Sequence, residues 1–247
     1  MFSLSDTDIL DKDDYIAFAQ KIKKHTDACG VPFLQAHSVF REITCKEDFD
    51  SIVKKHLRAL EFCEVLKCPI LVIHPANDFS PEDNHEYLYK PLLPFAQKRG
   101  VRIATENMWN WDSVKNCPYP TACGTVESFC KQIDLADSYY LTGCVDIGHA
   151  EMTNAPGADV LIRGLGKNRV GCLHVHDNDL FHDTHAIPYQ GNINWEKIIS
   201  ALRDISYCGN FALEVVSFIH TTPEDLLPDI FKYLDRVGRY LIKRITE

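Results

Sequence analysis

Short apolar runs alternate along the chain with longer stretches in which apolar residues recur at helical spacing. The runs predicted to be strands are 31–37, 69–74, 101–106, 143–147, 171–176 and 211–216. Amphipathic helices are predicted at 13–30, 194–209 and 223–245, where the apolar residues fall on one helical face. This alternation of strand and helix predicts an α/β protein with a parallel sheet and helical crossovers.

No low-complexity linker or break in composition divides the 247 residues, so a single domain over residues 1–247 is expected. An open doubly wound sheet and a closed (β/α) barrel both fit the alternation. No G-x-G-x-x-G sequence follows a predicted strand, which removes the commonest reason to prefer the open sheet. The positions of the polar residues decide between the two architectures.

Each predicted strand carries a side chain of metal-ligand type at or near its carboxyl end. These residues are His37, His74, Glu106, Asp146, His176 and Glu214. In a barrel the carboxyl ends of all strands surround one mouth, so the six side chains would converge there. In an open sheet the residues at opposite edges would lie far apart, and their buried carboxylates would lack partners. The pattern therefore favours the barrel.

Three of the converging side chains are carboxylates, which repel one another at close range unless a cation neutralises them. Oxygen-rich ligation with one imidazole suits Mn²⁺, Mg²⁺ or Co²⁺. The two-residue period of a strand places His174 and His176 on the same face, and His176, nearer the mouth, is the predicted ligand. Taken singly, His37 and His74 fit hydrogen-bonded core histidines better than ligands. The histidines of helix-like segments, His25, His56 and His85, are expected at the surface.

The charge, hydropathy and cysteine content of the chain weigh against nucleic-acid-binding, membrane and zinc-knuckle proteins. The chain has 26 basic and 35 acidic residues and no basic run, which weighs against a nucleic-acid partner. No stretch approaches 18 consecutive apolar residues, and the acidic N-terminus lacks the features of a signal peptide. The ten cysteines include no C-x-x-C pair, so a zinc knuckle is not expected. We therefore predict a cytoplasmic protein with reduced thiols and no membrane association.

Five segments carry specific motifs: IATENMW, CVDIGHA, CLHVHDND, DTHAIPYQGNINW and YCGNFALEV. Together, and in this order, they closely resemble the xylose-isomerase-like TIM-barrel family of sugar and sugar-phosphate isomerases and epimerases. The resemblance implies a (β/α)8 barrel with one divalent metal ion as cofactor (Mn²⁺, Mg²⁺, Co²⁺ or Zn²⁺). The implied metal ligands are Glu106, Asp146, His176 and Glu214.

The same resemblance assigns roles around the metal. It implies that Glu106 and Glu214 flank the substrate as an acid/base pair, and that His149, Asp183 and His185 line the substrate side of the mouth. The other candidates for substrate binding are His37, His74 and Trp109. Trp109 and Trp111 would offer apolar surface to the C–H faces of a sugar or pack the loop that holds them.

The chain departs from the family in its number of strands. A complete barrel needs eight, and six are predicted, so we expect a barrel that lacks the first one or two strands at the N-terminus. Residues 1–4 (MFSL) are interpreted as the tail of the second strand. An exposed barrel side would favour a homodimer.

The predicted activity is proton transfer beside a carbonyl through an enediolate, with a small sugar or sugar phosphate as the partner. Use of both faces of the substrate would invert a stereocentre, and use of one face would interconvert an aldose and a ketose. Endonuclease IV, a related phosphodiesterase with three zinc ions, is an alternative because its extra ligands match His37, His74, His149, Asp183 and His185. A keto-inositol dehydratase and a non-catalytic sugar-binding pseudoenzyme are further alternatives.

Overall fold

The computed structural model describes residues 2–4, 8–153, 155–215, 217–219 and 221–247. Within these residues seven parallel strands form one curled sheet in the order β1-β2-β3-β4-β7-β8-β9. The strands are β1 (Phe2–Ser3), β2 (Ala36–His37), β3 (Ile70–Val72), β4 (Arg102–Glu106), β7 (Leu141–Asp146), β8 (Val170–Val175) and β9 (Asn210–Leu213). The predicted α/β class of TIM-barrel type is confirmed.

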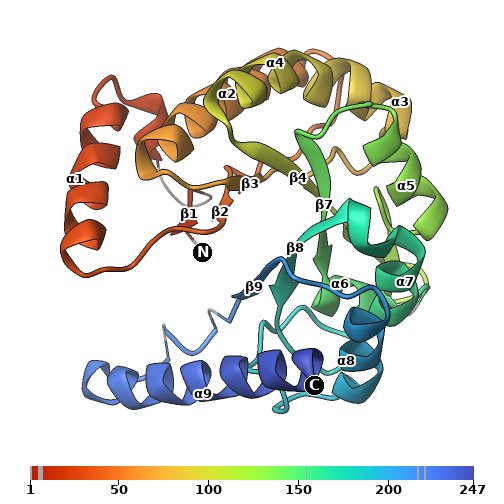
Figure 1. Cartoon of the computed structure of the whole chain (residues 1–247). Helices are drawn as coiled ribbons and strands as arrows, with labels where there is room; N and C mark the ends of the chain where they lie inside the picture. Colours follow the sequence, from red (N-terminus) through yellow and green to blue (C-terminus); the bar gives the residue numbers. More distant parts are fainter. Residues whose placement is uncertain (1, 5–7, 154, 216, 220) are drawn as a thin grey trace.

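Helices cover the outer face of the curled sheet, as Figure 1 shows. They are α1 (Tyr15–Ala28), α2 (Asp48–Leu66), α3 (Pro81–Asp83), α4 (Lys90–Arg99), α5 (Val126–Asp134), α6 (Ile147–Thr153), α7 (Ala158–Arg169), α8 (Trp195–Asp204) and α9 (Leu227–Thr246). A π-helix (Asn84–Tyr89) joins α3 to α4, and short 3-10 turns lie at Asp8–Asp11 and Glu224–Leu226. Pro228 lies in the first turn of α9, where a missing N–H costs no helical hydrogen bond.

The curled sheet has two edges, β1 and β9, which are not paired with each other in the described part of the chain. We call the side of the barrel between these edges the open side; α1 and α9 lie on its two flanks (Figure 1). The incomplete barrel agrees with the prediction. A strand also occurs in the segment 1–4, because Phe2 and Ser3 pair with Ala36 and His37, whereas residue 1 lies outside the described residues.

The strands next to the open side are shorter than predicted. The predicted strand 31–37 is reduced to Ala36–His37, and Val31 and Leu34 are 56% and 54% exposed. A strand that has few neighbours to pair with and little surface to bury against gains little from an extended conformation. The predicted strand 211–216 ends at Leu213, and residue 216 lies outside the described residues.

Alternation along the central strands separates the core into an outer and an inner layer. On β7, Val145 belongs to the cluster under the helices, whereas Cys144 belongs to a small inner cluster with Ile70, Val72, Ala104 and Cys172. Asp146, two residues beyond Cys144, therefore points to the barrel interior one layer above this apolar floor. The inner layer thus forms a dry base beneath the carboxyl ends of the strands.

One predicted surface residue is buried. His56, on α2, is 2% exposed, and its Nδ1 lies 2.8 Å from Ser38 Oγ. The surface prediction is wrong because this position falls on the helix face that packs on the sheet. Among the described residues no helix has the length and apolar character required to cross a membrane.

Candidate metal centre

Four strand ends bring three carboxylates and one imidazole to a single point, which we call the deep cluster. It consists of Glu106, Asp146, His174 and Glu214, whose donor atoms all lie within 4.8 Å of one another. His174 Nδ1 is 3.1 Å from Glu106 Oε1, 3.1 Å from Glu214 Oε2 and 3.7 Å from Asp146 Oδ2. The convergence of polar strand ends that the sequence predicted is therefore present.

The imidazole of the deep cluster is His174. The predicted ligand His176 belongs to two further groups of possible metal ligands, one with Asp146 and His149 and one with His185 and Glu214. The parallel register aligns Asp146 of β7 with His174 of β8, so these two side chains lie at the same height. His176 follows the end of β8 and lies nearer the mouth, 3.2 Å from Asp146 Oδ1 and 3.7 Å from Asp183 Oδ1. The register between the two strands, which the sequence does not give, decides which imidazole lies level with Asp146. The assignment of His176 as a metal ligand stays a prediction.

The asparagine after Glu106 fixes the position of Asp146. Asn107 donates from Nδ2 to the Asp146 carbonyl at 2.9 Å and accepts at Oδ1 from the Asp146 N–H at 2.8 Å. Through these two hydrogen bonds the side-chain amide of Asn107 pairs with the backbone of Asp146 as a neighbouring peptide group would, and it joins the ends of β4 and β7. The carboxylate Oδ1 of Asp146 accepts from the His149 N–H at 2.7 Å, which leaves Oδ2 for the deep cluster.

A second group of donors, which we call the inner-edge cluster, lies beside the deep cluster and shares Glu106 with it. His37 Nε2 and His74 Nε2 are 2.8 Å apart, and they lie 3.8 and 3.2 Å from Glu106 Oε2. The mouth cluster, a third group, surrounds Asp183. His149 Nε2 and His185 Nε2 lie 3.4 and 3.2 Å from Asp183 Oδ2.

Backbone carbonyls orient several of these imidazoles. The Nδ1 atoms of His37, His149 and His185 lie 2.8, 3.0 and 2.8 Å from the carbonyl oxygens of Ser38, Asn107 and Glu214. When Nδ1–H donates to a carbonyl, Nε2 is the nitrogen that carries the lone pair and can act as a metal ligand. The Nε2 atoms of His149 and His185 face Asp183, and that of His37 faces His74 and Glu106.

Opposite charges in the deep cluster shift the pKa values of its side chains. Burial opposes ionisation of Glu214, yet the His174 imidazole lowers the pKa of this carboxyl to about 2. Burial would also raise the pKa of Glu106, but His174 and His74 hold it well below its usual range. Burial alone would lower the pKa of His174, and the carboxylates of Glu106 and Glu214 raise it well above the ordinary value. The cluster therefore favours ionised carboxylates and attracts positive charge.

The donor set fits a divalent cation. Asp146 Oδ2 is buried and has no hydrogen-bond partner among the described residues, and Glu106 Oε2 is buried with His74 Nε2 3.2 Å away. Buried carboxylate oxygens are costly unless positive charge meets them. Three carboxylates and one imidazole are ligands typical of a Mn²⁺, Mg²⁺ or Co²⁺ site.

A cavity of about 500 Å³ opens over the deep cluster. Its lining includes both glutamates of the predicted acid/base pair and all six predicted substrate-binding residues: His37, His74, His149, Asp183, His185 and Trp109. Sequence reasoning missed the remaining lining residues, which are Phe40, Glu42, Asn77, Met108 and Asn110. These residues lie in the segments after the sheet strands, and their residue types alone do not indicate a binding site.

The two loops above the mouth contact each other. The hairpin of β5 (Trp109–Asp112) and β6 (Cys117–Pro120), which the sequence did not predict, brings Trp111 to Phe181 at a ring-centroid distance of 5.2 Å. Trp109 lines the cavity, whereas Trp111 packs between loops, so the two tryptophans have different positions.

A buried aspartate explains why two of the sequence motifs occur together. Asp177, fully buried, accepts hydrogen bonds from the N–H groups of Asn178, Tyr189 and Ile193 and from Trp195 Nε1, at 2.8–3.1 Å. It thereby clamps the loop that carries Asp183 and His185 to the start of α8. The HDND and GNINW segments are therefore one structural unit.

The fold and the converging donors define an α/β barrel of TIM type with a candidate metal site at the carboxyl ends of the strands. The chain belongs to the xylose isomerase-like TIM barrel family, whose family model matches residues 3–237. An uncharacterised protein from Methanocaldococcus jannaschii is 29% identical over 168 residues, which cover 63% of this chain and 54% of that protein. The chain thus matches little more than half the length of this curated relative.

Solved structures share the fold. A D-tagatose 3-epimerase-like protein superposes with a TM-score of 0.72 and 20% identity, covering 95% of this chain and 88% of that one. The IolI protein with a bound zinc atom gives a TM-score of 0.67 and 15% identity, covering 92% and 79% of the two chains. At these identities the likeness concerns the fold alone.

Proposed function

We propose that the protein is a metal-dependent sugar isomerase or epimerase that moves a proton on a carbon next to a carbonyl. The observation that carries this proposal is the pair Glu106 and Glu214, which line one cavity and belong to one cluster of donor atoms. Membership of the family and the similarity to an epimerase-like structure support it. The sugar and its phosphorylation state are left open.

The proposed chemistry assigns different work to the four residues of the deep cluster. A divalent ion held there would act as a Lewis acid and stabilise negative charge on the substrate oxygens. Asp146 and His174 hold donor atoms in place and take no proton from the substrate. One glutamate carboxylate removes the proton from carbon. The other must carry a proton when the substrate is bound, which the loss of water from the cavity favours, and it returns that proton to the enediolate.

Burial of the reacting groups fits this chemistry. The Glu106 and Glu214 side chains are 1% and 15% exposed, so a substrate in the cavity would displace most of the remaining water around them. An enediolate that is shielded from water is returned to a sugar instead of losing its proton to solvent. Trp109 provides an apolar part of the lining against which the C–H face of a sugar can pack.

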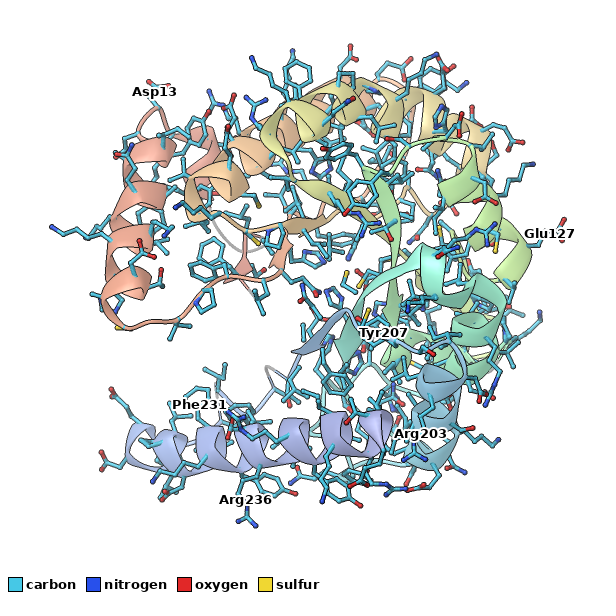
Figure 2. All side chains as sticks on the ribbon, viewed as in Figure 1. Asp13, Glu127, Arg203, Tyr207, Phe231 and Arg236 are labelled. Atoms are coloured by element: carbon cyan, nitrogen blue, oxygen red, sulfur yellow. The ribbon has the colours of Figure 1, made fainter. Side chains whose placement is uncertain are left out.

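Proton exchange tests the proposal directly. Protein loaded with Mn²⁺ is incubated with a panel of ketoses in heavy water, and deuterium uptake at carbon is measured by NMR. We expect exchange with at least one sugar and its loss in Glu214→Gln, with an unchanged circular dichroism spectrum. Glu127→Gln is the matched control, because this exposed glutamate points away from the barrel on α5 (Figure 2). No exchange with any sugar would refute the enzyme assignment, and tight sugar binding without exchange would favour the pseudoenzyme.

A second candidate is a phosphodiesterase of the endonuclease IV type with three zinc ions. The specific observation in its favour is that the inner-edge and mouth clusters supply two further groups of converging donors next to the deep cluster. Cleavage of a duplex with an abasic site by the zinc-loaded protein, with three zinc ions per chain, would support it. The net charge of -9 weighs against a polyanionic substrate. Loss of a hydroxyl from a keto-inositol, detected by NMR in the same panel, would instead support the dehydratase.

A further inference from the structure

Glu42 differs from the other carboxylates that line the cavity over the deep cluster. Glu106, Asp183 and Glu214 each have an imidazole nitrogen nearby, at 3.2, 3.2 and 3.1 Å. Glu42 also lines the cavity, but it is exposed and forms no hydrogen bond or ion pair with any residue that the structure describes. The lining therefore presents one unpaired negative charge at its exposed rim.

Among the described residues, the cavity lining contains no lysine or arginine that could balance the charge of Glu42. Arg41 lies between two lining residues in the sequence but does not line the cavity itself. The four lining histidines lie 3.2–3.8 Å from carboxylate oxygens of Glu106 or Asp183, so a proton on any of them is already paired. Arginine and lysine are the side chains that usually bind phosphate groups. A phosphate group in this cavity would therefore lack its usual side-chain partners.

Two asparagines give the cavity neutral hydrogen-bond donors. Asn110 Oδ1 accepts from the Trp111 N–H at 2.7 Å, and Asn77 Oδ1 accepts from Thr121 Oγ1 at 3.0 Å. These bonds orient both side-chain amides and occupy their oxygens. Both asparagines line the cavity, and their Nδ2 groups donate to no residue in the described part of the chain. The lining thus combines free N–H donors with the carboxylate acceptor of Glu42.

We propose, on the basis of the proposed function, that the substrate is an unphosphorylated sugar whose hydroxyl groups are bound by Glu42, Asn77 and Asn110. A hydroxyl group both donates and accepts, so it can donate to the Glu42 carboxylate and accept from an amide Nδ2. A phosphate ester carries roughly 1.5 to 2 negative charges at pH 7, and its oxygens are acceptors. Glu42 would meet it with a like charge and without a proton to share. Glu42 is therefore the residue that excludes phosphate esters.

Binding to the full chain tests the proposal without reference to activity. The Mg²⁺-loaded protein is titrated at low ionic strength with a panel of ketoses and with the terminal phosphate ester of each, for example D-fructose and D-fructose 6-phosphate. Ligand-observed NMR gives the dissociation constants. We expect at least one free sugar to bind, and its phosphate ester to bind at least 10-fold more weakly. High salt should narrow this difference, because it screens the charge of the exposed carboxylate.

Two variants of Glu42 separate its charge from its shape. Glu42→Gln keeps the size and an acceptor oxygen, so it should change the affinity for the free sugar by less than about 2-fold and tighten binding of the phosphate ester by roughly 3- to 10-fold. Glu42→Lys should tighten binding of the phosphate ester further. Glu127→Gln and Glu127→Lys are the matched controls, because they change the net charge equally at an exposed position that points away from the barrel (Figure 2). Both controls should keep the selectivity of the wild type.

Equal or tighter binding of the phosphate esters by the wild type overturns the proposal, as does unchanged selectivity in both Glu42 variants. The heavy-water assay separates this inference from the proposed function. Exchange in phosphate esters alone would refute the inference and leave the isomerase assignment intact. Binding of free sugars without exchange would refute the isomerase assignment and leave the selectivity of the cavity intact. Failure of every sugar and every phosphate ester to bind would refute both.

Discussion

The wall of the barrel formed by β4, β7 and β8 differs sharply from the strands that border the open side. The wall strands have five, six and six residues, and nearly all of their side chains are buried. By contrast, β1 and β2 have two residues each, and the four residues of β9 are all half-buried. Three of the four residues of the deep cluster project from the wall. The site is therefore built on the best-paired part of the sheet, away from its edges.

Glu214 is the exception, because it follows the edge strand β9. Its N–H donates to the Val175 carbonyl at 3.0 Å, and its carbonyl oxygen lies 2.8 Å from His185 Nδ1. These contacts tie Glu214 to β8 and to the clamped loop. The segment after the edge strand can thus hold a candidate site residue in a fixed position, although the packing of the strand itself is poor.

The largest expected effect comes from a change on the wall that serves two clusters. Glu106→Gln removes a proposed acid/base group and a donor of both the deep and the inner-edge clusters. We expect the rate of deuterium exchange to fall by roughly 10²–10⁴-fold, together with weaker Mn²⁺ binding. His37→Gln, on the short strand β2 next to the edge strand β1, removes a donor of the inner-edge cluster and should reduce exchange by roughly 10- to 100-fold. An equal loss in both variants would contradict the central role of the wall.

The second largest expected effect is on the free energy of unfolding, which should depend on the wall much more than on the open side. Leu173→Ala removes a fully buried side chain from β8 and should lower the free energy of unfolding by about 2–5 kcal/mol. Leu34→Ala, at the open side, removes a side chain that is 54% exposed. This substitution should change the free energy of unfolding by about 0.5 kcal/mol or less. Urea unfolding followed by circular dichroism measures both. A large loss for Leu34→Ala would mean that another surface covers the open side in solution.

The same contrast explains what the sequence could predict. The wall strands were located to within two residues because long apolar runs with a polar carboxyl end leave little ambiguity. The segment 31–37 has an equally apolar sequence, but it forms a strand only at Ala36–His37. Its conformation depends on how much neighbouring sheet is present, which is a property of the assembled barrel and not of the segment.

The sequence could predict which residue types form the candidate site, but it could not predict which histidine lies beside which carboxylate. The carboxylates Glu106, Asp146 and Glu214 converge as expected, because parallel strands end at one mouth. The choice between His174 and His176 required the register of β7 and β8, and a two-residue difference moves an imidazole from one cluster to another. The clamp by Asp177 was missed because three of its four partners are backbone N–H groups, which leave no pattern in the sequence.

Addition of metal should produce a smaller but clear stabilisation. An ion bound by the deep cluster joins three wall strands to Glu214 and binds only the folded chain. At a Mn²⁺ concentration 100 times the dissociation constant, we expect the free energy of unfolding to rise by about 2.7 kcal/mol. Chelator should reverse the change in thermal unfolding, and Glu214→Gln should show a smaller increase. An unchanged midpoint with and without metal would contradict the ligand assignment.

The smallest expected effect lies at the open side itself. Asn210 Nδ2 on β9 donates to the Leu34 carbonyl at 2.6 Å and so connects the two flanks of the open side. Because this hydrogen bond is exposed, water replaces it readily, and Asn210→Ala should lower the free energy of unfolding by about 0.5–1.5 kcal/mol. Asn192→Ala is the control, since its exposed side chain donates to the Asp179 carbonyl within one loop and bridges no sheet edges. Urea unfolding at equal protein concentrations compares the two variants. A loss above about 3 kcal/mol for Asn210→Ala alone would exceed what one exposed hydrogen bond supplies. Such a loss would mean that the edges β1 and β9 unfold together, so that unfolding is as cooperative across the open side as it is along the wall.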